Sequence, residues 1–558
     1  MRSPLHLLTI VLSVLVLPAA SHASWSLSGN PLSTAAADQL TETITSDGAG
    51  GAVVTWQDTR GGTNDIYARR VNASGVTQWT ADGVALCTAA GDQLSPQITS
   101  DGSGGAIVTW YDNRGGATTD IYVQRIDASG TPQWTADGVA LCTAVNDQVA
   151  PQIVSDGAGG AIVTWYDRRA GTNYDIYAQR VNASGVPQWT ANGVGVCTAA
   201  NDQTTPMIAS DTAGGAIVTW QDVRAGNNDI YAQRVNAAGV SQWTANGVVL
   251  CGLSSGQITP AIAADGAGGA VVTWFDGRSG ARGVYVQRVS DLGVPQWTAD
   301  GVALKTASTN QATTPLVCAD GSGGAIVAWM DNRSGGYDVY VRRVNSAGVA
   351  QWTANGVALC TAANDQYFPT LVPDGAGGAI VTWSDFRSGT ILNLYAQRVN
   401  TTGVPQWTAD GILVSTGATD KSSPTIETDG AGGAIVAWYQ TGNGNDVYVQ
   451  RLGASGTIPT GVSGPARGPS LAVGQAYPNP FSATVSLDVQ LATPAAVRLD
   501  VFDVAGRKVR SMTLSNAMTQ RVEFDGRDDM NRLLASGIYF CRIRALGETI
   551  TRKMVIAR

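Results

Sequence analysis

The sequence predicts an all-β chain in which an eight-bladed β-propeller is followed by a small Ig-like β-sandwich. The stretch GGAIVTW, or a close variant, recurs eight times at a spacing of 54 or 55 residues. A second tryptophan, usually in the pair QW, falls once in each repeat except the last. After the repeats the pattern stops, and a different series of alternating strands begins. The repeated tryptophans are Trp56, Trp110, Trp165, Trp220, Trp274, Trp329, Trp383 and Trp438.

Residues 1–23 have the layout of a secretory signal peptide, with a basic start, an apolar run and the small-residue end SHA. We expect cleavage after Ala23, and no later stretch has the length of apolar chain that a transmembrane segment needs. Both histidines, His6 and His22, precede that site. The mature chain would therefore have no histidine base, no histidine metal ligand and no Ser-His-Asp triad.

Each repeat is predicted to form one antiparallel sheet of four strands. In the third repeat these are PQIVSD, AIVTWYD, DIYAQRVN and PQWTANGVGVCT, which are rich in β-branched and aromatic residues and separated by Gly, Asn and Ser turns. No segment has helical periodicity. Sheets repeated in this way form either a ring of blades or an open solenoid.

The chain start indicates a closed ring. SWSLSGNPLST, residues 24–34, matches the end of a repeat such as QWTADGVALCT at 78–88, whereas the eighth repeat stops at 446–456 without that end. The first strand would complete the last blade and leave no exposed sheet edge. We therefore assign residues 24–452 to the propeller. It resembles secreted bacterial eight-bladed propellers in general and no specific family.

Five cysteines occupy one equivalent position in successive repeats, where other repeats have Ser33, Lys305 or Ser415. Neighbouring sheets lie ~10 Å apart, too far for a disulfide between equivalent positions. We interpret these cysteines as small packing residues. They are Cys87, Cys142, Cys197, Cys251 and Cys360.

An aspartate precedes the GAGG-type turn in every repeat. Such carboxylates accept backbone N–H bonds and stabilise the turn, and a calcium site is the alternative. No repeat has the dense oxygen ligands of an EF-hand loop, so we expect neither a metal nor a cofactor. The eight are Asp47, Asp101, Asp156, Asp211, Asp265, Asp320, Asp374 and Asp429.

An Asp-x-Arg pattern follows the core tryptophan in seven repeats, and the eighth has Gln440 and Gly442 instead. These arginines either pair with acids of the fold or form a ligand-binding ring for an acidic glycan or another anion. The candidate ligand-face residues are Arg60, Arg114, Arg169, Arg224, Arg278, Arg333 and Arg387.

The tail begins after a Gly-, Pro- and Ser-rich segment, 453–472, that we interpret as a flexible linker. Residues 473–558 carry YPNPF, VFDVAGRKV, FDGRDD and GIYF, and end in basic residues. This segment resembles the C-terminal sorting domain of the type IX secretion system and the Ig-like domain of flagellar hook-capping proteins. The resemblance implies export across the outer membrane, with contacts to the export machinery. The matching residues are Pro478, Asn479, Pro480, Phe481, Gly537, Tyr539 and Lys553.

Charge limits the partners. The chain has a net charge of −8, of which the tail from 473 onward contributes +4, so the repeat region is acidic and nucleic acid is not expected as a partner. The favoured function is a secreted or cell-surface binding module for a protein or glycan, rather than an enzyme. The alternatives are an extracellular carbohydrate-active enzyme, either glycosidase or lyase, and a structural surface-layer component. The aromatic pair Tyr367-Phe368 is a local departure from the repeat.

Overall fold

The structure is a computed structural model. It describes residues 25–278, 280, 282–306, 312–442, 444–459, 471–473, 476, 479–545 and 548–558. The predicted signal peptide, with His6 and His22, and most of the linker lie outside these residues. The chain divides into two compact units, Met1–Gly461 and Val462–Arg558. In the part that is described, no helix is long and apolar enough to cross a membrane.

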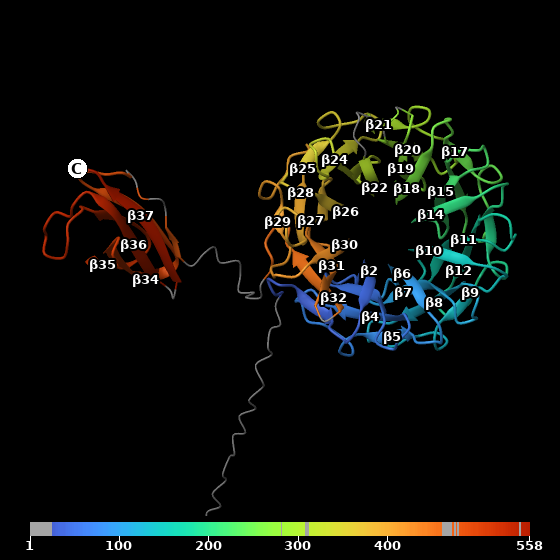
Figure 1. Cartoon of the computed structure of the whole chain (residues 1–558), viewed down its shortest axis with the longest axis horizontal. Coiled ribbons are helices and arrows are strands. Elements are labelled where there is room, and N and C mark those ends of the chain that lie inside the picture. The colour runs from blue at the N-terminus through green and yellow to red at the C-terminus, as the bar shows by residue number, and fades with distance from the viewer. Residues whose placement is uncertain are drawn as a thin grey trace, which may run out of the picture. The chain divides into compact units, whose positions relative to one another are not determined.

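The first unit is a ring of eight four-stranded antiparallel sheets, which confirms the predicted propeller (Figure 1). The first strands of the blades surround the central opening and are β2 (Gln39–Ser46), β6 (Gln93–Ser100), β10 (Gln148–Ser155), β14 (Gln203–Ser210), β18 (Gln257–Ala264), β22 (Ala312–Ala319), β26 (Gln366–Pro373) and β30 (Lys421–Thr428). The second strands are β3 (Ala52–Asp58), β7 (Ala106–Asp112), β11 (Ala161–Asp167), β15 (Ala216–Asp222), β19 (Ala270–Asp276), β23 (Ala325–Asp331), β27 (Ala379–Asp385) and β31 (Ala434–Thr441). The third strands are β4 (Asp65–Val71), β8 (Asp120–Ile126), β12 (Asp175–Val181), β16 (Asp229–Val235), β20 (Gly283–Val289), β24 (Asp338–Val344), β28 (Asn393–Val399) and β32 (Asn445–Leu452). The outer strands are β5 (Val84–Cys87), β9 (Val139–Cys142), β13 (Val194–Cys197), β17 (Val248–Cys251), β21 (Val302–Lys305), β25 (Val357–Cys360) and β29 (Ile412–Leu413), with β1 (Asn30–Ser33) serving the eighth blade.

The N-terminal strand closes the ring, as the sequence predicts. β1 pairs with β32 in the eighth blade, with Asn30 opposite Val449. Trp25 is buried, and its Nε1 donates to the carbonyl of Ala73 in the first blade (3.1 Å). This contact joins blade eight to blade one, so the last interface of the ring repeats the pattern of the other seven.

Adjacent blades pack through the core tryptophan of one and the apolar strands of the other. Trp110 of blade two lies in one buried cluster with Val53 and Ala68 of blade one. The QW tryptophans add an outer contact, because Trp79 donates from Nε1 to the carbonyl of Ala128 in the next blade (3.1 Å). Both tryptophan sets are therefore bound up in blade packing, which contributes most of the hydrophobic stabilisation.

The first strands line a central hollow of about 310 Å³. Ile44, Ile98 and Ile262 form an apolar belt around it. The lining residue just before this isoleucine differs between blades, for example Thr43 in blade one and Gln97 in blade two. In first strands such as β2, β10 and β26, the pairing with the second strand shifts at a β-bulge that follows the second residue. In β26 the bulge places Phe368 at a positive φ of 51°, and Phe368 remains about half exposed, at 51%.

The second unit is a C-terminal β domain, consistent with the predicted Ig-like fold. It contains β33 (Leu471–Val473), β34 (Val485–Asp503), β35 (Lys508–Phe524), β36 (Gly537–Ala545) and β37 (Glu548–Ile556). The sheet order is β33-β34-β36-β37, and β35 pairs with β34. Phe481, Leu499, Phe524 and Ile543 belong to its separate buried core.

Candidate functional site

The aspartate before each turn has a structural partner set. In blade three, Oδ1 of Asp156 accepts from the backbone N–H groups of Ala158 and Gly160, both at 2.8 Å. Its Oδ2 forms an ion pair with Arg180 at 2.9 Å. Because the same arginine donates to the carbonyl of Ala237 in the next blade (3.1 Å), this group stabilises both a turn and a blade interface.

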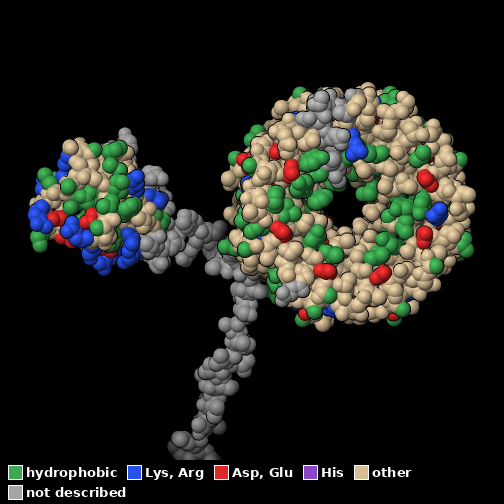
Figure 2. All heavy atoms as spheres, viewed as in Figure 1, with side chains coloured by type: hydrophobic (Ala, Val, Ile, Leu, Met, Phe, Trp, Pro, Cys, Tyr) green, Lys and Arg blue, Asp and Glu red, His purple; other side chains and the backbone are tan. Residues whose placement is uncertain are grey.

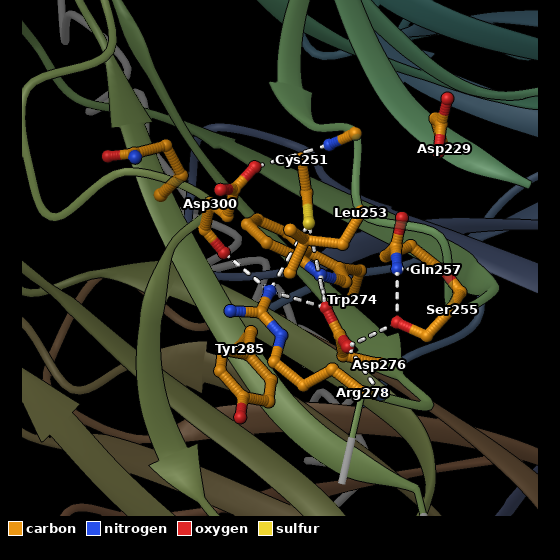
Figure 3. A network of polar contacts seen from close by, with 12 residues as sticks. Asp229, Cys251, Leu253, Ser255, Gln257, Trp274, Asp276, Arg278, Tyr285 and Asp300 are labelled. Carbon is orange, nitrogen blue, oxygen red and sulfur yellow. Dashed lines mark hydrogen bonds and ion pairs between the residues drawn. The ribbon is translucent and has the colours of Figure 1, made fainter. Parts of the chain in front are cut away.

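The Asp-x-Arg motif forms a second, separate network, shown for blade five in Figure 3. Asp276 accepts from Trp274 Nε1 (3.1 Å) and from Arg278 Nη2 (2.5 Å). The same Nη2 lies 3.2 Å from Sγ of Cys251, which comes from the outer strand of blade four. The guanidinium lies 3.9 Å over the ring of Tyr285. The motif therefore anchors the core tryptophan and joins two blades.

The candidate ligand-face arginines all belong to networks of this kind. Their side chains are 20–26% exposed, and each pairs with the aspartate two positions earlier and lies over a tyrosine. Burial acts to lower the pKa of Arg278, but its hydrogen bond and ion pair with Asp276 outweigh burial and raise it. All seven are fixed as cations beside a carboxylate: Arg60, Arg114, Arg169, Arg224, Arg278, Arg333 and Arg387.

The equivalent cysteines lie against this network as buried free thiols. Burial raises the pKa of the Cys251 thiol to about 12, so it remains protonated. On the outer strand of blade five, Lys305 takes the same position, and its Nζ lies 3.3 Å from Oδ2 of Asp331 in blade six. These positions pack the blade interface and supply no reactive thiolate.

Blade eight departs from this pattern. Gln440 replaces the aspartate, Gly442 replaces the arginine, and the indole Nε1 of Trp438 has no hydrogen-bond partner among the described residues. Lys421 replaces the glutamine that begins most first strands and is buried, and its Nζ bonds Asn393 Oδ1 (3.2 Å) and the carbonyl of Thr419 (3.0 Å). Burial lowers the pKa of the Lys421 amine.

Carboxyls at the start of five third strands have raised pKa values: Asp65, Asp120, Asp175, Asp229 and Asp338. Burial, followed by the charge of the aspartate opposite, raises the pKa of Asp65 and of Asp120 to about 6. Asp175 behaves in the same way. Such a value suits a general acid, but the position recurs around the ring and is therefore first a property of the blade.

An aromatic cluster of Tyr337, Tyr367 and Phe368 breaks the symmetry of the ring. Tyr337 comes from the loop before β24 in blade six, and the other two come from β26 in blade seven. The ring centroids of Tyr337 and Tyr367 lie 6.2 Å apart, and those of Tyr367 and Phe368 lie 6.0 Å apart. Figure 2 shows hydrophobic side chains gathered beside the central opening on the face in view.

Asp365 holds this cluster in place. Its Oδ2 accepts from the Tyr367 hydroxyl (2.6 Å), and its Oδ1 accepts from the backbone N–H of Tyr337 (2.8 Å). The hydrogen bond to Asp365 raises the pKa of Tyr367 to about 12. The backbone N–H of Phe368 donates to Sδ of Met330 (3.1 Å). These bonds hold the Tyr367 hydroxyl and the backbone at Tyr337 and Phe368 without a ligand.

The sequence singled out Tyr367 and Phe368 but missed Tyr337 and Asp365. A signal was present, since only two repeats place a tyrosine just before the third strand, Tyr174 and Tyr337. Tyr174 makes an edge contact with Tyr166 (5.1 Å), and the Arg168 guanidinium lies 5.6 Å from its ring. Blade three thus carries a smaller, second aromatic group.

The predicted sorting residues divide between the core and the surface of the tail: Phe481 and Tyr539 are buried, whereas Asn479, Pro480 and Lys553 are exposed. Asn479 donates to the carbonyl of Lys553 (3.0 Å) and accepts from the N–H of Val555 (2.7 Å). Phe481 is buried, and the Tyr539 hydroxyl donates to the carbonyl of Ala535 (3.0 Å). Gly537 begins β36, Pro480 follows Asn479, and Pro478 lies outside the described residues. Lys553 is exposed.

No group of three or more acidic, histidine or cysteine side chains suited to a metal occurs among the described residues. The expectation that the propeller needs no cofactor stays a prediction.

Comparison with known proteins identifies the tail. Residues 475–557 match the family described as the secretion system C-terminal sorting domain. The tail is therefore a type IX sorting domain, as its motifs predict, and the protein is secreted or displayed on the outer cell surface. Such a tail implies an interaction with the export machinery.

The whole chain is less well related to known proteins. No curated protein matches it. Among solved structures, it is similar to a polysaccharide lyase of the ulvan lyase family PL25 at 10% identity and a TM-score of 0.41, over 79% of this chain and 98% of that one. It is also similar to an α-L-arabinanase of Penicillium chrysogenum at 13% identity and a TM-score of 0.32, over 56% and 94%. PorZ, a type IX secretion component of Porphyromonas gingivalis, aligns at 10% identity and a TM-score of 0.22, over 91% and 74%. At these scores, none of the three transfers an activity to this chain.

Proposed function

We propose that the propeller is an extracellular glycan-binding module, carried out of the cell by its sorting tail. The aromatic cluster of Tyr337, Tyr367 and Phe368 supports this proposal. It is a group of partly exposed aromatic rings that spans two blades and departs from the repeat, and non-repeating residues are where a repeat protein is free to acquire specificity.

The chemistry of the cluster favours a sugar. Aromatic faces bury the apolar C–H surface of a pyranose, and the adjacent carboxylate can accept hydrogen bonds from its hydroxyls. Asp365 already fixes the tyrosine side, so that binding would cost little side-chain ordering. A protein partner is the competing ligand class, because aromatic residues also dominate protein interfaces.

The candidate arginine ring is a second possible ligand surface and stays a prediction. Its ion pairs with aspartates weigh against it, since an anionic ligand would have to compete with a carboxylate at 2.5 Å, as in Arg278 and Asp276.

A glycan array probed with the full chain tests the proposal. We expect binding to one or a few glycans, and F368A and Y367A each to weaken it by about tenfold, which corresponds to about 1.4 kcal/mol. L292A is the matched control, because Leu292 is an exposed apolar residue (77%) outside the cluster. Equal binding by all four proteins would contradict the proposal, and binding to protein probes alone would reassign the ligand.

An enzyme acting on such a glycan is the second candidate. One observation favours it: Asp338 directly follows Tyr337, and burial raises the pKa of its carboxyl, as a general acid requires. D338N would then abolish turnover while leaving glycan binding intact. Product release from the bound glycan, followed by chromatography, separates the two functions.

A further inference from the structure

The sorting motif of the tail serves mainly to build its fold, which leaves open which surface the export machinery contacts. The side chains of Asn479 and Tyr539 donate hydrogen bonds to backbone carbonyls. Phe481 and Tyr539 also belong to the buried core. Lys553 of β37 extends into solvent, and so does Phe540 of the GIYF motif, which lies opposite it on β36. The strand neighbours of Lys553 therefore define the surface to examine.

The strand register places three outward rows beside one another. In the first row, Phe502 of β34 lies opposite Phe540 of β36, which lies opposite Lys553 of β37. In the second row, Asp500 lies opposite Arg542, and in the third, Arg498 lies opposite Arg544. Because side chains alternate across a strand, these residues share one face, while Leu499, Val501 and Ile543 point into the core.

The first row borders a hollow of about 330 Å³. Phe502, Phe540 and Val504 give it apolar walls, and Asp503, Arg542 and Thr551 form its polar side. The guanidinium of Arg542 lies 4.7 Å over the ring of Phe502. Phe540 and Ile538 remain partly exposed on β36, at 39% each, and Val504 is 71% exposed.

Cations dominate the rest of this face. Asp500 is buried beneath three of them, with Arg498 at 3.4 Å, Arg544 at 3.8 Å and Lys508 at 3.9 Å. The single negative charge of Asp500 cannot neutralise these three cations. Arg542 and Lys553 lie beside them and add two more positive charges. Among the described side chains of these three rows, the five cations face one carboxylate, and Asp503, which also lines the hollow, is paired with Arg507 at 3.1 Å. The surface therefore combines an apolar hollow with a positive border.

We propose that this face of β34, β36 and β37 is the docking surface for the type IX export machinery. The partner it fits is an acidic protein segment whose apolar or aromatic side chain enters the hollow between Phe502 and Phe540. Charge complementarity argues for the acidic character, because a cationic rim steers an anionic partner and repels a basic one. The hollow argues for a protein segment, since an apolar anchor in a pocket is the usual centre of a protein interface.

The test follows export of the full chain in a bacterium with a type IX system. The double variant R542E/R544E reverses the border, and F540S removes one wall of the hollow. We expect each to lower the exported fraction by at least about tenfold, with the protein retained in the periplasm. The double variant R542K/R544K keeps the charge and is expected to recover most of the export. Normal export of both R542E/R544E and F540S would overturn the proposal.

A matched control and a fold control accompany these variants. R532E reverses an arginine that is 72% exposed and pairs with Asp528 in a turn outside β34, β36 and β37, and its export should be unchanged. Thermal melting of the purified full-length variants checks that the tail still folds. If R532E is retained as strongly as R542E/R544E, export depends on total charge, and the proposed face is wrong.

An anionic membrane surface is the other occupant with this chemistry. Vesicles that contain lipopolysaccharide measure it directly with the purified full chain. Normal export of R542E/R544E, together with loss of vesicle binding and of surface retention, would assign the face to the membrane and overturn docking to the machinery. Glycan binding by the propeller is measured on the same samples and is expected to be unchanged, so the two proposals fail independently.

Discussion

Gly29 lies directly against Trp438, although one residue is near the start of the propeller and the other is in its last blade. A Cβ at Gly29 would lie 2.5 Å from the indole carbon Cη2 of Trp438. The equivalent contact occurs inside other blades, where Gly83 meets Trp56 at 2.7 Å. The N-terminal strand therefore occupies the same place in blade eight that an outer strand occupies elsewhere.

We expect G29A to destabilise the ring closure specifically. Gly29 has a φ of +82°, so alanine adds strain of about 1–2 kcal/mol as well as the clash with Trp438. The control is G48A, because Gly48 also has a positive φ (+72°) but nothing within 4 Å of its Cβ position. Thermal melting and proteolysis of the N-terminal strand measure the difference. Equal losses in the two variants would show that Trp438 does not restrict this position.

Glu42 is a buried acid at the interface of blades one and eight, at a position where the other first strands have proline. Burial raises the pKa of its carboxyl well above 4.5, and nearby backbone N–H groups offset only part of that effect. As the pH rises above 4.5, the unfolded chain loses this proton before the folded one, so the carboxyl lowers the stability of the fold until its folded pKa is reached.

We therefore expect E42Q to stabilise the protein at pH 7.5 and to change little at pH 4. The parent should lose about 1.4 kcal/mol per pH unit between the two pKa values relative to E42Q. Chemical denaturation at several pH values gives the comparison. Parallel stability curves for the parent and E42Q would refute the raised pKa.

The seven complete Asp-x-Arg networks predict how blade eight responds to repair. Q440D alone buries a carboxylate near Trp438 without its cation, which we expect to cost about 2–3 kcal/mol. G442R in the same chain supplies the cation, and the backbone there permits it, because Gly442 has no positive φ and its Cβ would lie 3.2 Å from the flexible Asp446 side chain. A double-mutant cycle should give a favourable coupling of about 1–3 kcal/mol. Simple additivity would show that the motif does not act as a unit.

R278A distinguishes the two interpretations of the arginine ring. If Arg278 supports the fold, the variant leaves Asp276 buried and unpaired, and we expect a loss of about 3 kcal/mol. Glycan binding at blades six and seven should survive once the protein is folded. The opposite pattern, unchanged melting with lost binding, would support the arginines as a ligand surface.

Much of this architecture could be predicted because its signals are local. Alternating β-branched residues and a fixed spacing give the strands and the number of blades, and the incomplete last repeat identifies the closing strand. The sorting tail could be predicted equally well, because its motifs lie in one contiguous segment. Only part of the aromatic cluster could be predicted from the sequence, because Tyr367 and Phe368 are adjacent in the chain whereas Tyr337 belongs to another blade.

The amino-acid sequence by itself determined the repeat, the ring closure and the export signal, because each depends on spacing along one chain. The tertiary structure decided which groups meet across blades: Cys251 beside Arg278, Tyr337 beside Tyr367, and Gly29 beneath Trp438. It also decided which tail residues face solvent. These contacts depend on how neighbouring sheets pack and which face of a strand is covered, and a repeat pattern specifies neither by spacing alone.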